Sequence, residues 1–339
     1  MNYRILWNVE DVTQKYKSLT KTLKIMGRII GIFAVFALLL TACGQKSDST
    51  LTGEIKISGA YALYPLATEW VEEFQSLHPG VKIHLQAGGA GKGITDALTQ
   101  AVDLGMVSRE LFQTEINKGA VCFSVAKDAV VATVNAKNPL VKDILAHGIS
   151  AEDAKKIWIT SEAKVWGDIL GNGDQTPIAV LTRSDACGAA ETWASWLGKK
   201  QEDLNGNRVH SDPGLVEAVR KDVNSIGLNN IGYAYDTKTH KPVDGILVVP
   251  IDRDGDGKIS SDEYFYDNKD NVAKAIEEGK YPSPPARNLY FVSKGLPQNE
   301  AAVEFLKYVL SKEGQAKNIP AGYIKMPDNQ LQKELDKLQ

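Results

Sequence analysis

The feature that most constrains this chain is a strand pattern that ends in charged residues and turns through glycine into a helix. Apolar residues 178–181 predict a strand, Arg183 and Asp185 follow it, and Gly188 opens a helical pattern with Trp193 on its apolar face. The first N–H groups of a helix lack intrahelical acceptors and lie at the positive end of its dipole. Together with the planar guanidinium of Arg183, they would form a small anion site without a metal. The alternative is an ordinary strand–turn–helix in which Arg183 pairs with Asp185.

Strand, turn and helix patterns of this kind recur earlier in the chain. Residues 81–85 alternate as a strand and run into the glycine-rich segment 87–93, and apolar residues 102–107 end in Ser108 and Arg109. Such repetition predicts an α/β fold with mostly parallel sheets. Ligands of these sheets bind at the carboxyl ends of the strands, so we expect the three turns to contribute to one site.

The glycine-rich segment 87–93 does not match the P-loop pattern of nucleotide-binding proteins. Gly93 follows Lys92 where that pattern requires Ser or Thr, and Gln86 stands where its first glycine belongs. We therefore expect backbone N–H groups of this segment to form an anion-binding nest, with a plain turn as the alternative.

The length and charge of the chain limit the classes of function. A chain of 339 residues has room for two domains of about 100–200 residues each. Its net charge of -3 argues against a nucleic-acid partner, because such proteins carry a basic surface.

The N-terminal region has the pattern of an export signal. Basic residues precede an apolar run, 29–40, which is shorter than the roughly 20 residues that span a bilayer. The run ends in Leu-Thr-Ala-Cys-Gly, which resembles a bacterial lipobox and implies cleavage before Cys43 and acylation of its thiol. We expect a signal peptide over 1–42, with Met26 as a candidate true start, and a flexible, lipid-anchored tether over 43–52. The alternative is a buried helix that ends in cysteine.

Taken together, the segments after the tether resemble periplasmic phosphate-binding (PstS-like) substrate-binding proteins of ABC transporters. The resemblance implies a type II periplasmic binding protein fold, in which two α/β lobes, each a mostly parallel sheet flanked by helices, close on one oxyanion in the cleft between them. Because 229–235 looks like a strand returning to the first lobe, we expect lobe 1 over 53–134 and 240–339 and lobe 2 over 135–239. The pieces that carry the resemblance are 59–70, 87–94, 102–110, 148–157 with Trp166, and 183–193.

The same resemblance implies which residues hold the anion. Arg183, oriented by Asp185, and Ser108 match the family pattern, whereas several positions where the family has hydroxyl groups do not. A site loses about 1–3 kcal/mol for each oxygen left unpaired, so backbone N–H groups, Arg109 and Lys92 would have to compensate, or the ligand is not phosphate. The positions without a hydroxyl are Ala60, Ala62, Ala90, Cys187 and Ala189. The expected ligand-binding residues are Leu63, Tyr64, Gly89, Ala90, Gly91, Ser108, Arg109, Arg183, Asp185, Cys187, Gly188 and Ala189.

A second motif, residues 252–263, matches the twelve-residue calcium loop of EF-hands. Calcium requires six to eight hard oxygen ligands, and Gly257 stands where the loop must turn sharply. The preceding residues 245–251 have a strand pattern, so we expect a single calcium loop with a structural role, with an Asp/Gly-rich surface turn as the alternative. The expected Ca²⁺ ligands are Asp252, Asp254, Asp256, the carbonyl of Lys258, Ser260 and Glu263.

These observations predict a monomeric, membrane-anchored protein of the cell envelope, facing the periplasm or cell exterior, which captures a small oxyanion for an ABC permease and catalyses nothing. Phosphate is the leading ligand, and sulfate, molybdate and tungstate are alternatives. A hydrolase with Cys187 as nucleophile is a further alternative, because a thiol at a helix N-terminus beside arginine can have a lowered pKa. A calcium-dependent surface sensor or adhesion module is the last alternative. We expect Cys122 and Cys187 to be free thiols.

Overall fold

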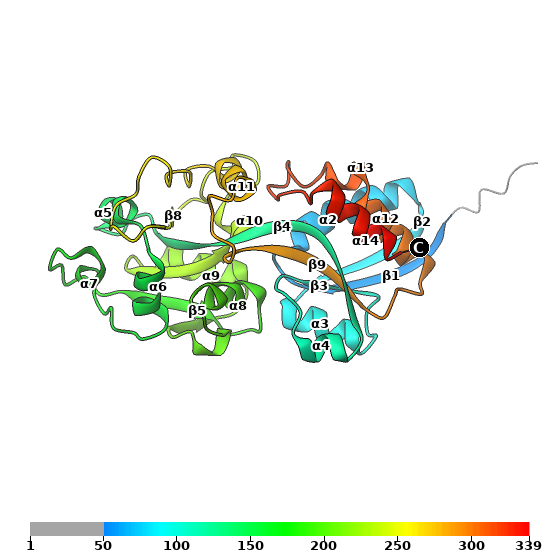
Figure 1. Ribbon diagram of the computed structural model, residues 1–339, viewed down its shortest axis with the longest axis horizontal. Helices are drawn as coiled ribbons and strands as arrows, with labels where there is room; N and C mark the ends of the chain where they lie inside the picture. The colour runs from blue at the N-terminus through cyan, green and yellow to red at the C-terminus, as the bar shows by residue number, and fades with distance from the viewer. Residues whose placement is uncertain (1–50, 339) are drawn as a thin grey trace, which may run out of the picture. The chain divides into compact units, whose positions relative to one another are not determined.

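A computed structural model describes residues 51–338, which form two lobes arranged side by side (Figure 1). The expected signal peptide, Cys43 and most of the expected tether lie outside the described residues. No helix among residues 51–338 is both long and apolar enough to cross a membrane.

The first lobe is built on β1 (Thr52–Gly59), β2 (Gly80–Ala87) and β3 (Leu104–Val107), which are parallel, and on β9 (Ala286–Lys294), which runs antiparallel to β3. Alternation along β1 buries Ile55 and Ile57. Helical spacing in the following helix buries Trp70 and Phe74 against the same core. The helices of this lobe are α2 (Tyr64–Leu77), α3 (Ala90–Leu98), α4 (Gln113–Asn117), α12 (Glu300–Leu310), α13 (Lys312–Gln315) and α14 (Asp328–Asp336).

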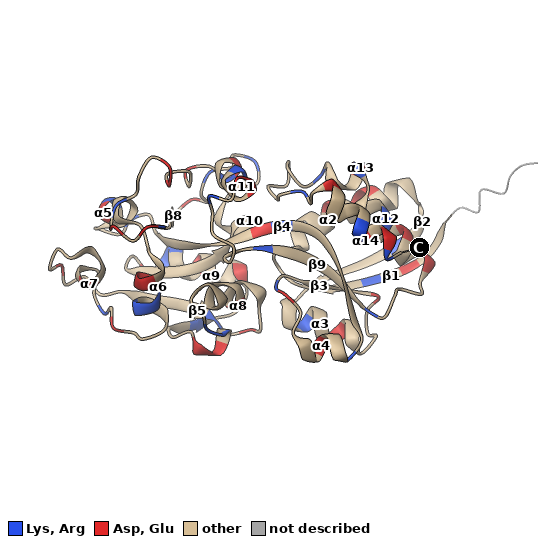
Figure 2. Cartoon of the chain, in the orientation of Figure 1, with Lys and Arg blue, Asp and Glu red and all other residues tan. Residues whose placement is uncertain are grey.

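One long strand, β4 (Ala120–Asn135), belongs to both lobes. Its residues 120–129 pair with β9 in the first lobe, and residues 130–134 pair with β7 in the second. The sheet order is therefore β2-β1-β3-β9-β4-β7-β5-β6, with β8 also on β4. Charged segments lie on the strands where they pass between the lobes (Figure 2).

The second lobe has a smaller sheet in which β5 (Ala179–Arg183) is parallel to β6 (Asn207–Val209) and β7 (Ser225–Asn230), while β8 (Ile246–Val249) is antiparallel to β4. Its core includes Trp158 and Trp193, whose rings meet edge to face with centroids 5.3 Å apart. The predicted two-lobed α/β fold is thus confirmed. The helices are α5 (Val141–His147), α6 (Ala151–Trp158), α7 (Gly167–Leu170), α8 (Gly188–Trp196), η1 (Gln201–Asp203), α9 (Asp212–Lys221), α10 (Ile231–Ala234) and α11 (Lys269–Glu277).

The expected assignment of residues 240–286 to the first lobe is wrong. Val248, Tyr266 and Tyr281 pack with Ala129 and Val131 of the second half of β4. The chain does not return to the first lobe at 229–235, because β7 ends there and the short helix α10 follows. The return occurs only at β9, so lobe 2 extends from the middle of β4 to about residue 286.

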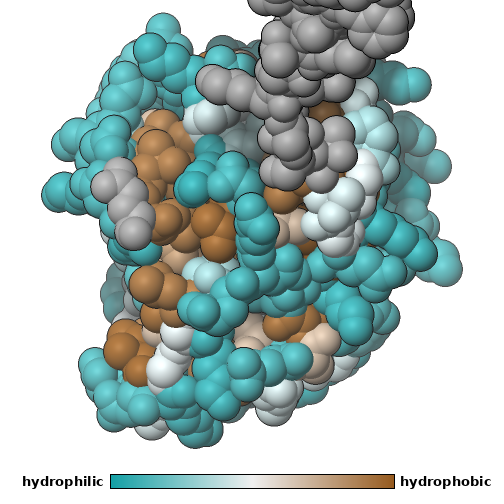
Figure 3. Space-filling model, turned by 90° about the vertical axis from the view of Figure 1, so that its right-hand side faces the viewer, coloured by the Kyte–Doolittle hydropathy of each residue, from teal (hydrophilic) through white to brown (hydrophobic). Residues whose placement is uncertain are grey.

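The far end of the first lobe carries apolar residues in several patches with hydrophilic residues around them (Figure 3). Leu77 and Leu296 are among the exposed large apolar side chains of residues 51–338. Single exposed apolar residues are ordinary on protein surfaces, and we assign no role to them.

Candidate functional site

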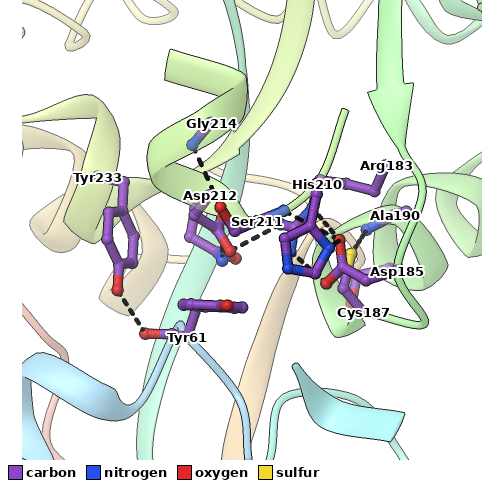
Figure 4. A network of polar contacts seen from close by, with 12 residues as sticks. Tyr61, Arg183, Asp185, Cys187, Ala190, His210, Ser211, Asp212, Gly214 and Tyr233 are labelled. Atoms are coloured by element: carbon purple, nitrogen blue, oxygen red, sulfur yellow. Dashed lines mark hydrogen bonds and ion pairs between the residues drawn. The ribbon is translucent and has the colours of Figure 1, made fainter. Parts of the chain in front are cut away.

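Arg183 lies at the carboxyl end of β5, where its side chain points into the protein and is fully buried. Nε and Nη2 donate to the two carboxylate oxygens of Asp185 at 2.9 and 2.6 Å, and Nη1 donates to Oδ2 of Asp212 at 2.7 Å. The fork of the guanidinium is therefore held by two carboxylates (Figure 4). The ring of Tyr61, from the first lobe, lies with its centroid 5.8 Å from Cζ of Arg183.

Burial and charge act in opposite directions on these groups. Burial alone would lower the pKa of Arg183, but Asp212 and Asp185 raise it, so the guanidinium is permanently charged. Burial alone would raise the pKa of Asp185, and the hydrogen bonds and charge of Arg183 lower it on balance. One cation thus faces two carboxylates, and this cluster carries a net charge of about -1 before any ligand binds.

The start of α8 leaves two backbone donors free. Cys187 is the N-cap, its N–H donates to Oε1 of Gln201 at 3.0 Å, and its Sγ accepts from the N–H of Ala190 at 3.4 Å. The N–H groups of Gly188 and Ala189, which come between, donate to no acceptor among the described residues. These are the donors that a helix N-terminus offers to an anion.

The thiol of Cys187 is not prepared for nucleophilic attack. It is buried, and burial raises its pKa to about 12 although the charge of Arg183 acts in the opposite direction. His210 lies near Asp185, with 3.9 Å between Nδ1 and Oδ1, but its side chain is 69% exposed, and the hydrogen bonds of the described residues include none between it and the thiol. Cys122 and Cys187 are both free, as expected.

Loops of the first lobe meet this helix start directly. The N–H of Gly91 donates to the carbonyl of Ala186 at 3.0 Å, across the boundary between the lobes. A methyl group added to Gly89, whose φ is +85°, would lie 3.1 Å from Oδ2 of Asp185. A methyl group on Gly188 would lie 2.2 Å from both the carbonyl oxygen and Oγ of Ser108. The glycine-rich loop, Ser108 and the α8 turn therefore converge, as the sequence predicts.

Three of the expected ligand residues, Leu63, Tyr64 and Arg109, do not offer a side chain or a free donor to this point. Leu63 is buried in the core, and the N–H groups of Leu63 and Tyr64 donate within their own turn to Ala60 and Tyr61. The side chain of Ala90 is buried in the core of the first lobe, but its backbone N–H, at the start of α3, donates to no acceptor among the described residues. Arg109 forms a forked pair with Glu115, with N–O distances of 2.9 and 2.6 Å, so its guanidinium is directed at a carboxylate of its own lobe. Lys92, a candidate to compensate for lost hydroxyls, pairs with Asp96 instead.

The structure adds residues that sequence reasoning missed. Asp212 begins α9 and accepts from Nδ2 of Asn230 at 2.5 Å as well as from Arg183. Asn230 in turn accepts from Arg287 of β9, which pairs with Asp128 of β4 with Nε–Oδ1 at 2.7 Å. A Ser-Asp-Pro sequence at 211–213 signals a helix start, but nothing in it identifies a partner 29 residues away.

Contacts between the lobes also come from tyrosines. The hydroxyl of Tyr233, on α10, donates to the carbonyl of Tyr61 at 3.1 Å (Figure 4). Tyr61 also lies close enough to Arg183, Asp185 and Asp212 for their charges to act on its pKa, which is raised mainly by burial. The first loop therefore reaches the site through Tyr61 rather than through the expected Leu63 and Tyr64.

Two cavities lie along the same boundary. One of about 670 Å³ is lined by Gly91, Ala186 and Cys187 of the converging loops and by Phe112. The other, of about 570 Å³, lies beside the crossing strands and is lined by Arg287 and Tyr281. Arg109, Phe112 and Glu191 line both cavities, so these residues form a shared wall.

The calcium-loop motif folds as a compact turn between β8 and α11. Carboxylate oxygens of Asp252, Asp254 and Asp256 lie within 4.8 Å of one another, and Gly257 has a φ of +75°. Asp252 and Glu263 are each only 2% exposed to solvent, although both are acidic. Oε1 of Glu263 accepts from the N–H of Arg253 at 2.8 Å, which brings the two ends of the motif together. The oxygen-rich donor set therefore fits a hard cation.

Comparison with known proteins places the chain in a family. A family model described as the PBP superfamily domain matches residues 44–313. The phosphate-binding protein PstS of Staphylococcus haemolyticus is 25% identical over 316 residues, covering 89% of this chain and 93% of that relative. The protein of the same name from Pseudomonas aeruginosa is 27% identical over 341 residues, covering 96% and 99%.

Solved structures share the fold. A Clostridium perfringens protein with bound phosphate has a TM-score of 0.66 at 23% identity and covers 81% of this chain and 100% of its own. An ABC-type phosphate transport receptor from Vibrio cholerae has a TM-score of 0.58 at 21% identity, with 80% and 100% covered. The expected resemblance to PstS-like proteins is confirmed, and the chain belongs to the PBP superfamily.

Proposed function

We propose that this chain captures a small oxyanion between its lobes, with phosphate as the first candidate, and delivers it to an ABC importer. The observation that carries the proposal is the meeting of Gly91 and Ser108 with the N-terminus of α8, where two N–H groups are free beside a buried arginine. The names of the relatives support phosphate and an ABC partner.

Binding of this kind requires no chemical step. The anion accepts hydrogen bonds from the N–H groups of Gly188 and Ala189 and from the hydroxyl of Ser108, beside the buried guanidinium of Arg183, whose own N–H groups are directed at Asp185 and Asp212. Because these donors come from both lobes, the ligand stabilises the closed arrangement. A neutral, buried thiol at Cys187 provides no nucleophile, which supports a binding role over the hydrolase alternative.

Isothermal titration calorimetry with phosphate, arsenate, sulfate, molybdate and tungstate tests this proposal. We expect at least one of these anions to bind, and we expect Gly89→Ala to weaken that binding because the added methyl lies against Asp185. Gly171→Ala is the matched control, since Gly171 also has a positive φ, +64°, but nothing lies within 4 Å of the added methyl. Binding of none of the five anions would refute the proposal, and equal effects of the two substitutions would refute the site.

We further propose that the chain is exported, anchored through a lipid on Cys43, and monomeric. The pattern of the apolar run and the Leu-Thr-Ala-Cys-Gly sequence support the anchor. Metabolic labelling with a fatty acid should mark the wild-type chain and not a Cys43→Ser variant, and size-exclusion chromatography with light scattering should give the mass of one chain. Labelling of both forms would exclude Cys43 as the acceptor.

We also propose a structural Ca²⁺ in the loop 252–263, held by Asp252, Asp254, Asp256, the Lys258 carbonyl, Ser260 and Glu263. The loop connects β8 to the segment before α11, and the N–H of Ile259 donates to the carbonyl of Ala146 at 2.8 Å. Ca²⁺ would neutralise acidic groups that burial otherwise leaves close together, so it would hold this side of the second lobe in place.

Thermal unfolding with and without a chelator tests the calcium proposal. A cation at 100 times its dissociation constant stabilises the folded state by about 2.7 kcal/mol. We expect Ca²⁺ to raise the Tm of the wild-type chain and not that of Glu263→Gln. Asp262→Asn is the control, because Asp262 is adjacent and exposed but pairs with Arg253 and Lys280 outside the ligand set. An identical response of all three proteins to Ca²⁺ would contradict the proposal.

A further inference from the structure

A lysine of the second lobe is buried against a turn of the first. Lys269 is the first residue of α11, and its side chain is fully buried. Its Nζ donates to the carbonyl of Ala321 at 3.1 Å, and a methyl group added to Gly322 would lie 1.8 Å from its Cε. Ala321 belongs to the core of the first lobe, whereas Val272 of α11 packs with the second half of β4. Lys269 therefore crosses the boundary between the lobes, where α11 faces the segment after α13 (Figure 1).

The ammonium group of Lys269 has little compensation for its loss of water. The carbonyl of Ala321 is the one hydrogen-bond acceptor that Nζ reaches within residues 51–338, although an ammonium can donate three hydrogen bonds. The adjacent carboxylate of Asp270 pairs with His240 instead, with 2.8 Å between Oδ2 and Nδ1. Burial lowers the pKa of Lys269, although nearby carboxylates act in the opposite direction. Burial of this charge therefore costs free energy, and the cost disappears when water reaches the ammonium.

The turn that covers Lys269 is joined to the anion site. The hydroxyl of Tyr323 in this turn donates to the carbonyl of Ala62 at 2.7 Å. Ala62 follows Tyr61, whose ring lies with its centroid 5.8 Å from Cζ of Arg183. Arg183 and Lys269 both belong to the second lobe. A movement of the first lobe that takes Tyr61 away from Arg183 therefore also takes the turn away from Lys269.

We propose that Lys269 opposes closure of the lobes and thereby speeds the release of bound phosphate. In the closed arrangement its ammonium is buried with one acceptor, and in the open arrangement it returns to water. Part of the free energy of phosphate binding offsets this burial, so the affinity is lower than the contacts at the site alone would give. The inference rests on the proposed function, because a protein that delivers its ligand to an importer must also let it go.

Lys269→Met tests the inference, because methionine keeps an unbranched side chain and removes the charge. In calorimetric titration with inorganic phosphate, we expect the variant to bind at least about fivefold more tightly than the wild type, since replacing a buried charge with an apolar side chain is often stabilising. Stopped-flow measurements should place most of this change in the rate of phosphate release. Lys274→Met is the matched control, because Lys274 lies on the same helix with its side chain 73% exposed, and it should keep the wild-type affinity and release rate.

Chemical labelling of the wild-type chain provides a second measurement that does not depend on a variant. An N-hydroxysuccinimide ester acylates amines that water can reach, and mass spectrometry of the peptides locates the label. We expect Lys269 to be acylated in the phosphate-free chain and protected by saturating phosphate. Lys274 should be acylated in both states.

The outcomes separate the inference from the proposed function. If the wild type binds phosphate and Lys269→Met binds it equally or more weakly, the inference is overturned and the proposed function stands. Protection of Lys269 in the phosphate-free chain also overturns the inference, because the residue would then stay buried when the lobes open. If neither protein binds phosphate, phosphate capture and the inference both fail.

Discussion

Gly188→Ala tests the closed site with the least disturbance to the fold. Gly188 is the first residue of α8, and no positive φ is required there, so alanine fits its backbone. The added methyl, however, would lie 2.2 Å from the carbonyl oxygen and from Oγ of Ser108, whereas real Cβ atoms keep at least 3.0 Å from other heavy atoms. Ser108 belongs to the first lobe and Gly188 to the second, so the clash exists only when the lobes are closed.

The expected magnitude follows from the cost of overpacking. Extra methyl groups in close-packed sites cost about 1–3 kcal/mol, and one contact here is a backbone carbonyl that cannot rotate away. If closure accompanies binding, the dissociation constant should rise by about 5- to 150-fold. The open form loses nothing, and alanine in place of glycine stabilises a helix by up to about 1 kcal/mol. The unfolding free energy of the ligand-free protein should therefore stay the same or rise.

Two measurements test this prediction. Calorimetric titration with the best-binding anion measures the affinity, and urea unfolding measures the stability of the ligand-free protein. Gly214→Ala is the matched control, because Gly214 lies in the first turn of α9 and its added methyl would meet nothing closer than 3.3 Å. Wild-type affinity in Gly188→Ala would refute the closed site. A loss of affinity matched by a loss of stability in the ligand-free protein would show that the substitution damages the second lobe instead.

Three further predictions concern the buried charges and the thiol. Arg287→Met leaves Asp128 buried without its partner and should lower the unfolding free energy by about 3–5 kcal/mol in urea, whereas Arg220→Met, which removes an exposed pair with Glu217, should cost less than about 1 kcal/mol. Arg183 lowers the pKa of Asp185 despite burial, so the stability from this carboxylate is present above about pH 4 and is lost as the pH falls further. Asp185→Asn should therefore make the unfolding free energy depend less on pH below about pH 4. An unchanged dependence on pH would contradict this. With a pKa raised to about 12, the thiol of Cys187 should resist iodoacetamide at pH 7.5 until denaturant is added, as mass spectrometry of the modified peptides would show; rapid native alkylation would revive the hydrolase alternative.

Local patterns in the sequence predicted the parts of the site that are close together along the chain. Arg183 and Asp185 alternate at a strand end, and a side chain two residues away is within reach of the guanidinium, so their pairing follows from spacing alone. The glycine-rich turn and the start of α8 were also predictable, because glycine after a strand and before an amphipathic run has few structural uses.

Residues far apart in the sequence were not predictable in this way. Asp212 reaches Arg183 only because β5 and β7 are adjacent strands and α9 comes between them in the chain. The pairing of Arg109 with Glu115 was not predicted, because Glu115 lies in the first turn of α4 and only the fold brings it to the guanidinium. The predicted lobe boundary was wrong for a similar reason. β8 pairs with β4, and a strand pattern in the sequence does not reveal which strand will be its neighbour.

The buried charges explain why backbone geometry, rather than net charge, should control affinity in this protein. Asp185, Arg183, Asp212, Asn230, Arg287 and Asp128 form one connected series of polar contacts from the start of α8 to the crossing strands. Two guanidinium groups face three carboxylates in it, so an arriving anion gains no net attraction from the series as a whole. Removing Arg183 would leave the buried carboxylate of Asp212 and the half-buried carboxylate of Asp185 without their partner, so a folding defect could not be told from a binding defect. The free N–H groups of Gly188 and Ala189 have no partner among the described residues of the protein, so they serve the anion alone. The methyl group of Gly188→Ala holds the lobes apart without disturbing the buried charges. It therefore reports on binding more directly than removal of the arginine does.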